Sequence, residues 1–302
     1  MNINIRKIIL FLVLTFAVNY LMVFVYVQTG GKWEGWPPMA LAITYMFIPM
    51  IMAFIVQKVI YHQPARVPFG ISFKINRWFF VAWFLPPVLA FATMAVSLLL
   101  PGVSYTPDMS GFISTFGKTL TPEQVEQMRQ QMAALPVHPI WLGLLQGLIA
   151  GTTINAIAGF GEESGWRGLL QRELAPLGFW KSSLLIGAIW GIWHAPLILQ
   201  GHNYPQHPQL GVLMMTAWCT LMGPVISYVR VKARSVIAAA IFHGTINATF
   251  GLSIMLISGG NDLTVGLTGL AGFIAFAITD IAIFIFDRSI TGEPANKILR
   301  ET

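Results

Sequence analysis

Eight long apolar stretches dominate this chain, and they restrict it to folds that sit in a lipid bilayer. A helix needs roughly 20 mostly apolar residues to cross the hydrocarbon core. The stretches of about this length are 8–27, 39–57, 78–100, 140–160, 182–200, 209–229, 235–257 and 264–286. Only 10% of the 302 residues are charged, whereas soluble domains are about 25% charged. The sequence therefore predicts an all-α polytopic membrane protein with about eight transmembrane helices, folded as a single domain over 1–302.

Basic residues are distributed unevenly between the predicted loops. With the N-terminus placed in the cytoplasm, 15 of the 18 Lys and Arg fall in cytoplasmic segments, and only Lys32, Lys118 and Arg129 fall outside. Cytoplasmic loops of membrane proteins carry such an excess. Topology thus explains the net charge of +6, and no nucleic-acid partner is expected. We expect an integral membrane protein with both termini in the cytoplasm, located in the plasma membrane if the source is prokaryotic.

The longest predicted outside connection, residues 101–139, contains a polar helix. Thr121 can cap this helix, Pro122 suits its first position, and Gln124 completes a capping box. Apolar side chains then recur at helical spacing, at Val125, Met128, Met132 and Leu135. We expect this stripe to pack on the protein or on lipid headgroups rather than to bind a ligand.

Ionisable and amide side chains interrupt three of the apolar stretches. They occur in Gly-Glu-Glu-Ser-Gly-Trp-Arg at 161–167, Trp-Gly-Ile-Trp-His at 190–194 and His-Gly-Thr-Ile-Asn at 243–247. Such groups are costly at membrane depth, and they usually mark function there. These three segments are therefore the predicted functional core, within about 140–250.

The spacing within the three segments predicts how their side chains meet. Residues four apart share one face of a helix, which pairs Glu163 with Arg167, Trp190 with His194, and His243 with Asn247. No proline occurs between 161 and 174, so we expect the helix to continue through this range. That continuation moves Glu162 inward, toward the depth of the histidines.

Side chains of these types can hydrolyse an amide bond. A glutamate in a poorly solvated pocket can act as a general base. Glu162 would take a proton from a water molecule that His194 also holds. His243 and Asn247, one turn apart, can donate hydrogen bonds to the oxyanion that forms. The supporting residues are Glu163, Arg167 and Trp190.

The three segments resemble the motif set of the CAAX protease and bacteriocin-processing enzyme family, also called the Abi family. That set is Glu-Glu-x-x-x-Arg, then an aromatic residue-x-x-x-His, then His-x-x-x-Asn or Asp. Here the motifs begin at Glu162, Trp190 and His243. The family's second motif usually begins with Phe, and Trp190 keeps the aromatic character of that position.

The resemblance implies an eight-helix intramembrane endopeptidase whose active site lies in a cavity within the bilayer, open toward the cytoplasm. It implies that Glu162 and His194 activate water, and that His243 and Asn247 form the oxyanion hole. The partner would be a membrane-associated protein or peptide, with or without a prenyl group. Many bacterial members of the family serve in bacteriocin immunity.

Two alternatives stay open. The first is a zinc-dependent version of the same hydrolase, with Glu162, His194 and His243 as ligands. We place it second to a reaction without cofactors, because no His-Glu-x-x-His occurs here. The second is a non-enzymatic bacteriocin-immunity or membrane binding protein. Serine and aspartyl mechanisms are disfavoured, because no Gly-x-Ser-x-Gly occurs and Asp280 is the only aspartate within a span.

Overall fold

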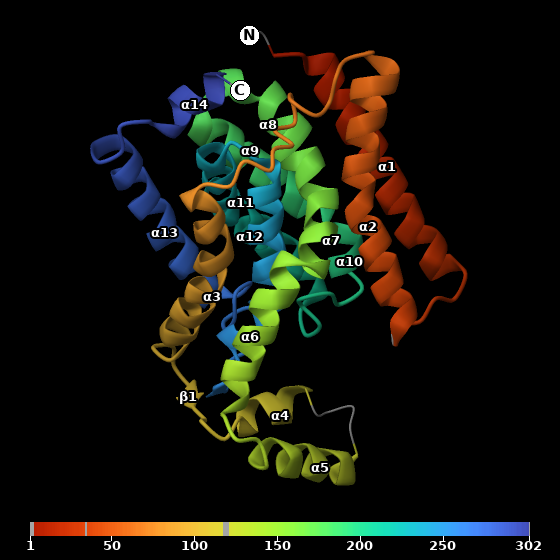
Figure 1. Cartoon of the computed structure of the whole chain (residues 1–302). Helices are drawn as coiled ribbons and strands as arrows, with labels where there is room; N and C mark the ends of the chain where they lie inside the picture. The colour runs from red at the N-terminus through yellow and green to blue at the C-terminus, as the bar shows by residue number, and fades with distance from the viewer. Residues whose placement is uncertain (1–2, 34, 117–120, 302) are drawn as a thin grey trace.

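The computed structural model describes residues 3–33, 35–116 and 121–301, and most of this chain is helical (Figure 1). The elements, in chain order, are α1 Ile5–Gln28, α2 Trp36–Phe54, η1 Ile55–Ile60, α3 Arg77–Ser97, β1 Ser104–Tyr105, α4 Ser110–Phe116, α5 Pro122–Ala133, α6 Pro139–Thr152, α7 Ile154–Glu163, η3 Ser164–Leu170, α8 Gln171–Glu173, η4 Ala175–Leu177, α9 Phe179–Trp193, α10 Ala195–Ile198, α11 Pro208–Ala233, α12 Val236–Thr249, η5 Phe250–Ser253, β2 Ile257–Ser258, α13 Leu270–Ser289 and α14 Ala295–Glu301. The segments η1 and η3 are π-helical.

The predicted class, an all-α polytopic membrane protein, is confirmed, but the spans differ in detail from those expected. Within the described residues, six helices are long and apolar enough to cross a membrane, and the bent pair formed by α6 and α7–α8 makes up to seven. The expected span at 182–200 is instead α9, of 15 residues, followed by the four-residue α10. Pro196 explains the early end, because a proline has no N–H to donate to the carbonyl of Ile192, four residues earlier, and its ring crowds that carbonyl.

Both termini lie at the same end of the bundle, which we call the terminal end (Figure 1). The six long helices and the bent pair account for up to seven spans, and the 15-residue α9 is too short to be counted with them. The cytoplasmic location of the terminal end stays a prediction, and Lys118, expected on the opposite side, lies outside the described residues.

A break divides the expected span at 140–160 into two helices, which meet at an angle of 50°. Thr153, at the break, has φ −116° and ψ −101°. Its hydroxyl donates to Ile149 O at 2.7 Å, and such back-bonding bends helices. Beyond the break, α7 continues through η3 to Glu173, so the predicted continuation of the helix past Glu162 is confirmed.

Helix α12 packs directly into this break. A Cβ atom built on Gly244 would lie 2.5 Å from both Ala156 N and Gly151 O. Only a glycine permits such close approach of two backbones, and Gly244 directly follows His243 in the sequence. The break therefore places the third motif against the helix that carries the first.

Helix α9 is held beside α11 in a similar way. Cβ atoms at Gly187 and Gly191 would collide with the α11 backbone, at Cys219 O and at Thr216 Cα. Small residues four apart commonly let helices approach this closely in membranes. The second motif, at the end of α9, is thereby fixed against α11.

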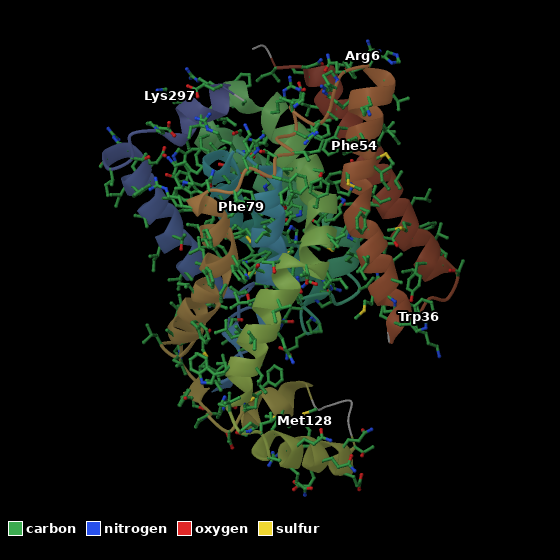
Figure 2. The ribbon with its side chains drawn as sticks, in the orientation of Figure 1. Arg6, Trp36, Phe54, Phe79, Met128 and Lys297 are labelled. Atoms are coloured by element: carbon green, nitrogen blue, oxygen red, sulfur yellow. The ribbon has the colours of Figure 1, made fainter. Side chains whose placement is uncertain are left out.

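The polar helix predicted in the 101–139 connection is α5, which lies at the end of the bundle away from the termini (Figures 1 and 2). Its capping box is confirmed, with Thr121 N–H donating to Gln124 Oε1 at 2.8 Å and Gln124 N–H to Thr121 Oγ1 at 3.3 Å. Val125, Met128 and Met132 pack against the main core, as expected.

Candidate active site

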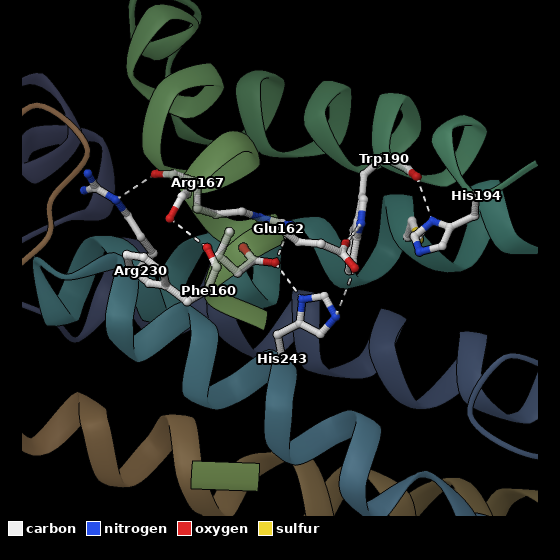
Figure 3. Close-up of polar contacts among 10 residues, drawn as sticks. Phe160, Glu162, Arg167, Trp190, His194, Arg230 and His243 are labelled. Atoms are coloured by element: carbon white, nitrogen blue, oxygen red, sulfur yellow. Dashed lines mark hydrogen bonds and ion pairs between the residues drawn. The ribbon is translucent and has the colours of Figure 1, made fainter. Parts of the chain in front are cut away.

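Glu162 lies in the last turn of α7 with only 2% of its surface exposed. Its Oε2 accepts a hydrogen bond from the indole N–H of Trp190 at 2.6 Å. Its Oε1 lies 4.0 Å from His243 Nε2. The first residues of the three motifs, Glu162, Trp190 and His243, therefore meet at one point of the structure (Figure 3).

Glu163 and Arg167 form the pair that their spacing predicts. Arg167 Nη1 donates to Glu163 Oε1 at 3.1 Å, and both side chains are fully buried. The same carboxylate oxygen lies 2.8 Å from His243 Nδ1. Glu163 thereby orients the imidazole so that Nε2 faces Glu162. The Arg167 guanidinium also lies over the Trp190 ring, 4.5 Å from its centroid.

His194 directly follows the last residue of α9, and its ring orientation is set by the helix itself. Its Nδ1 lies 2.8 Å from Trp190 O, one turn earlier (Figure 3). A carbonyl oxygen can only accept, so Nδ1 carries the proton and Nε2 of the neutral ring is left with a free lone pair. Trp190 and Trp193 flank the ring, with centroids at 5.5 and 4.8 Å.

Asn247 projects from α12 one turn beyond His243. Its side chain is exposed, and it lines the same cavity as Glu162, His194 and His243. The four predicted catalytic residues thus share one cavity, which Trp190 also lines. The other two predicted supporting residues lie behind this lining, with Glu163 against His243 and Arg167 against the Trp190 ring.

The cavity has a volume of about 360 Å³. Besides the four residues above, its walls are mainly aromatic and apolar. They are formed by Ala42, Tyr45, Met46, Trp190, Trp193, Leu197, His202, Asn203, Met215, Trp218, Met222 and Phe250.

The lining residues show in which direction along the bundle the cavity extends. His202 and Asn203 lie in the loop after α10, on the side away from the terminal end (Figure 1). Toward the terminal end, residues 161–171 are all buried, and they do not line the cavity beyond Glu162. The cavity therefore extends away from the termini, and the side of the membrane on which it opens stays a prediction. The motif positions could not show this, because they give depth but not packing.

Two contributions to the site were missed by the sequence analysis. Helix α2 supplies Tyr45, whose hydroxyl donates to Trp193 O at 2.5 Å. Asn19 of α1 accepts from the Trp193 indole at 2.8 Å. Polar side chains inside the first two apolar stretches were the available signal. For His202, in the loop after α10, the sequence carried no signal.

Cys219 and Asp280 stand apart from the proposed chemistry. Cys219 is fully buried, and its Sγ lies 4.0 Å from His194 Nδ1. Asp280 lies in α13, and its Oδ1 has no hydrogen-bond partner among the described residues.

The predicted ligands of the zinc-dependent alternative are Glu162, His194 and His243, which all line the cavity. Across the described ranges, however, no three His, Cys, Asp or Glu side chains are grouped closely enough to hold a metal ion. His243 Nδ1 and His194 Nδ1 are engaged with protein oxygens, which leaves the Nε2 atom of each ring available. The zinc alternative therefore stays a prediction to be tested.

Comparison with known proteins agrees with the motif pattern. Residues 138–249 match the family described as type II CAAX prenyl endopeptidase Rce1-like. The chain is also 33% identical over 127 residues to CAAX prenyl protease 2 of Methanococcus maripaludis. That alignment covers 39% of this chain and 44% of the relative, so the chain matches less than half of the relative's length.

Proposed function

We propose that this chain is an intramembrane endopeptidase, because residues 138–249 match the type II CAAX prenyl endopeptidase Rce1-like family. It hydrolyses a peptide bond of a membrane-associated protein or peptide. The observation that carries this proposal is the convergence of Glu162, His194, His243 and Asn247 on one cavity inside the bundle.

Glu162 is the proposed general base. It is buried, and its Oε1 is not bound by the tryptophan that holds Oε2. A water molecule in the cavity could donate one proton to Glu162 and a second hydrogen bond to the lone pair of His194 Nε2. The water oxygen would then attack the scissile carbonyl. Trp190 serves both residues, since its indole holds Glu162 and its carbonyl holds His194.

His243 and Asn247 are the proposed donors to the oxyanion. Glu163 accepts at His243 Nδ1 and can balance the charge of a protonated ring, so that Nε2–H becomes a donor toward the cavity. The amide of Asn247, one turn away, provides a second donor. Arg167 contributes indirectly by holding Glu163.

The cavity walls suit an apolar group beside the scissile bond. Met46, Met215 and Met222 line them, and methionine adapts to irregular apolar partners. We therefore propose a substrate with an apolar or lipid group near the cleavage site, of which a prenylated CAAX peptide is one example. On the basis of the charge distribution, we also propose that the termini are cytoplasmic and, for a prokaryotic chain, that the protein lies in the plasma membrane.

The test is cleavage of a farnesylated CAAX peptide by the purified full chain in detergent. Glu162→Gln and His194→Ala should abolish cleavage while the protein keeps its thermal unfolding midpoint. Glu126→Gln is the matched control, because Glu126 is an exposed residue of α5, far from the cavity, and should cleave normally.

A chelator should leave the wild-type rate unchanged, since we propose that no metal takes part. Loss of cleavage with chelator, restored by zinc, would instead support the zinc-dependent mechanism. If the wild type cleaves neither the farnesylated nor the unmodified peptide, the endopeptidase proposal fails for this substrate class, and a non-enzymatic membrane binding role gains support.

A further inference from the structure

A row of buried polar side chains leads from the proposed general base, Glu162, toward the terminal end of the bundle. Glu163, Arg167 and Gln171 follow one another at intervals of four along α7, η3 and α8, and each has no exposed surface. Residues four apart lie on one face of a helix. Ser227 and Arg230 of α11 are also buried, with Arg230 2% exposed. We call these five residues the polar stripe.

The two helices of the polar stripe face each other. Arg230 Nε donates to Arg167 O at 3.1 Å (Figure 3). Ser227 is three residues before Arg230 and thus on the same face of α11. Within the described residues, no carboxylate pairs with Arg230, so its charge is balanced by no direct ionic partner.

The polar stripe holds an unusual concentration of unpartnered atoms. Seven of its buried side-chain atoms have no hydrogen-bond partner among the described residues: Glu163 Oε2, Arg167 Nε, Arg167 Nη2, Gln171 Oε1, Gln171 Nε2, Ser227 Oγ and Arg230 Nη1. Buried polar groups are nearly always satisfied by protein or by ordered water. Because both donors and acceptors are unpartnered here, an anion could satisfy only some of them, whereas water can satisfy all.

We infer that the polar stripe holds ordered water and supplies it to the proposed general base, Glu162. A buried water typically makes about three hydrogen bonds, so about two or three molecules would satisfy the stripe. Glu163 connects this water to the site, because its Oε1 binds the His243 ring whose Nε2 lies 4.0 Å from Glu162. The inference rests on the proposed hydrolase function.

This arrangement answers a difficulty that the cavity raises. An apolar substrate that fills the cavity would expel water from it, although hydrolysis consumes one water molecule in each turnover. The polar stripe lies on the opposite side of Glu163 from the direction in which the cavity extends. It can therefore keep water beside the carboxylates while substrate occupies the cavity.

The first test is independent of activity. A structure of the full chain, determined at a resolution that shows ordered water, should contain at least two water molecules bridging Gln171, Arg230 Nη1 and Glu163 Oε2. A dry stripe, in which these side chains bond to one another instead, would overturn the inference.

The second test measures, through kcat, whether the polar stripe supplies water to Glu162. Gln171→Leu removes two of the polar atoms that hold the proposed water, so kcat should fall about tenfold with KM unchanged. Ser227→Ala, a smaller change, should act in the same direction if Gln171→Leu does not fold. Gln57→Leu is the matched control: Gln57 is equally buried but donates to Pro64 O, so its replacement should lower the midpoint and leave kcat unchanged.

The outcomes separate this inference from the proposed function. Unchanged kcat in both Gln171→Leu and Ser227→Ala would overturn the supply role even if water is present. Absence of any cleavage by the wild type would count against the endopeptidase proposal. The structure with ordered water would then still test whether the polar stripe is hydrated.

Discussion

Replacing Gly244 by alanine should damage the site without touching any of the proposed catalytic residues. The added Cβ would lie 2.5 Å from Ala156 N and Gly151 O, whereas ordinary contact begins at 3.4 Å. Both atoms belong to the backbone at the helix break and cannot rotate away. The two helices must therefore separate locally by about 0.9 Å, the difference between these distances.

The expected losses of stability and of kcat follow from the residues beside Gly244. Overpacking of this kind typically costs about 1–3 kcal/mol of stability. His243 is the preceding residue, and it would move relative to Glu163 and Glu162, which it now meets at 2.8 and 4.0 Å. A displacement of about 1 Å in a catalytic group can cost roughly 100-fold in rate. We expect a lower unfolding midpoint and a kcat about two orders of magnitude below that of the wild type.

Gly251→Ala provides the control for this experiment. Gly251 lies just beyond the end of α12, in η5, and a Cβ there would meet no atom within 4 Å. The variant should match the wild type in both thermal unfolding and peptide cleavage. The reasoning is refuted if Gly244→Ala behaves like Gly251→Ala in both measurements.

Three further predictions follow from single contacts. Arg167→Met should destabilise the protein by about 3–5 kcal/mol, because it breaks a fully buried ion pair; thermal unfolding should show part of this recovered in Arg167→Met with Glu163→Gln, and no recovery would contradict the pairing argument. His202→Ala should raise KM up to about tenfold, the worth of one lost hydrogen bond to substrate, with an unchanged unfolding midpoint; an unchanged KM would show that the His202 ring does not contact substrate. Thr121→Ala should cost about 1 kcal/mol in the local stability of α5, because its side chain caps that helix; faster amide hydrogen exchange in α5 with unchanged cleavage is expected, and protected amides would argue against the cap.

Much of the site could be predicted because polar residues are conspicuous in apolar helices. Spacing of four was enough to pair Glu163 with Arg167, and the structure confirms that contact at 3.1 Å. The same rule predicted that Trp190 would lie beside His194. These are local relations within one helix, which a sequence records directly.

Relations between helices were harder to predict. The break at Thr153 depends on where α12 packs, and the glycines that allow that packing lie about 90 residues apart in the chain. The direction of the cavity depends on the loop holding His202, which has no distinctive sequence. The short α9 could have been anticipated from Pro196, but hydropathy alone extended the span to residue 200.

The close backbone contacts at Gly187, Gly191 and Gly244 also determine how this chain can vary. At these three positions any side chain meets backbone atoms of a neighbouring helix. In a saturation library scored for membrane expression, they should reject nearly every substitution. Lipid-facing positions such as Val13 and Ile281, which are 57% and 60% exposed, should accept most apolar residues. Sequence divergence among functional variants should therefore gather on the outer surface of the bundle, while the spacing between helices around the cavity stays constant.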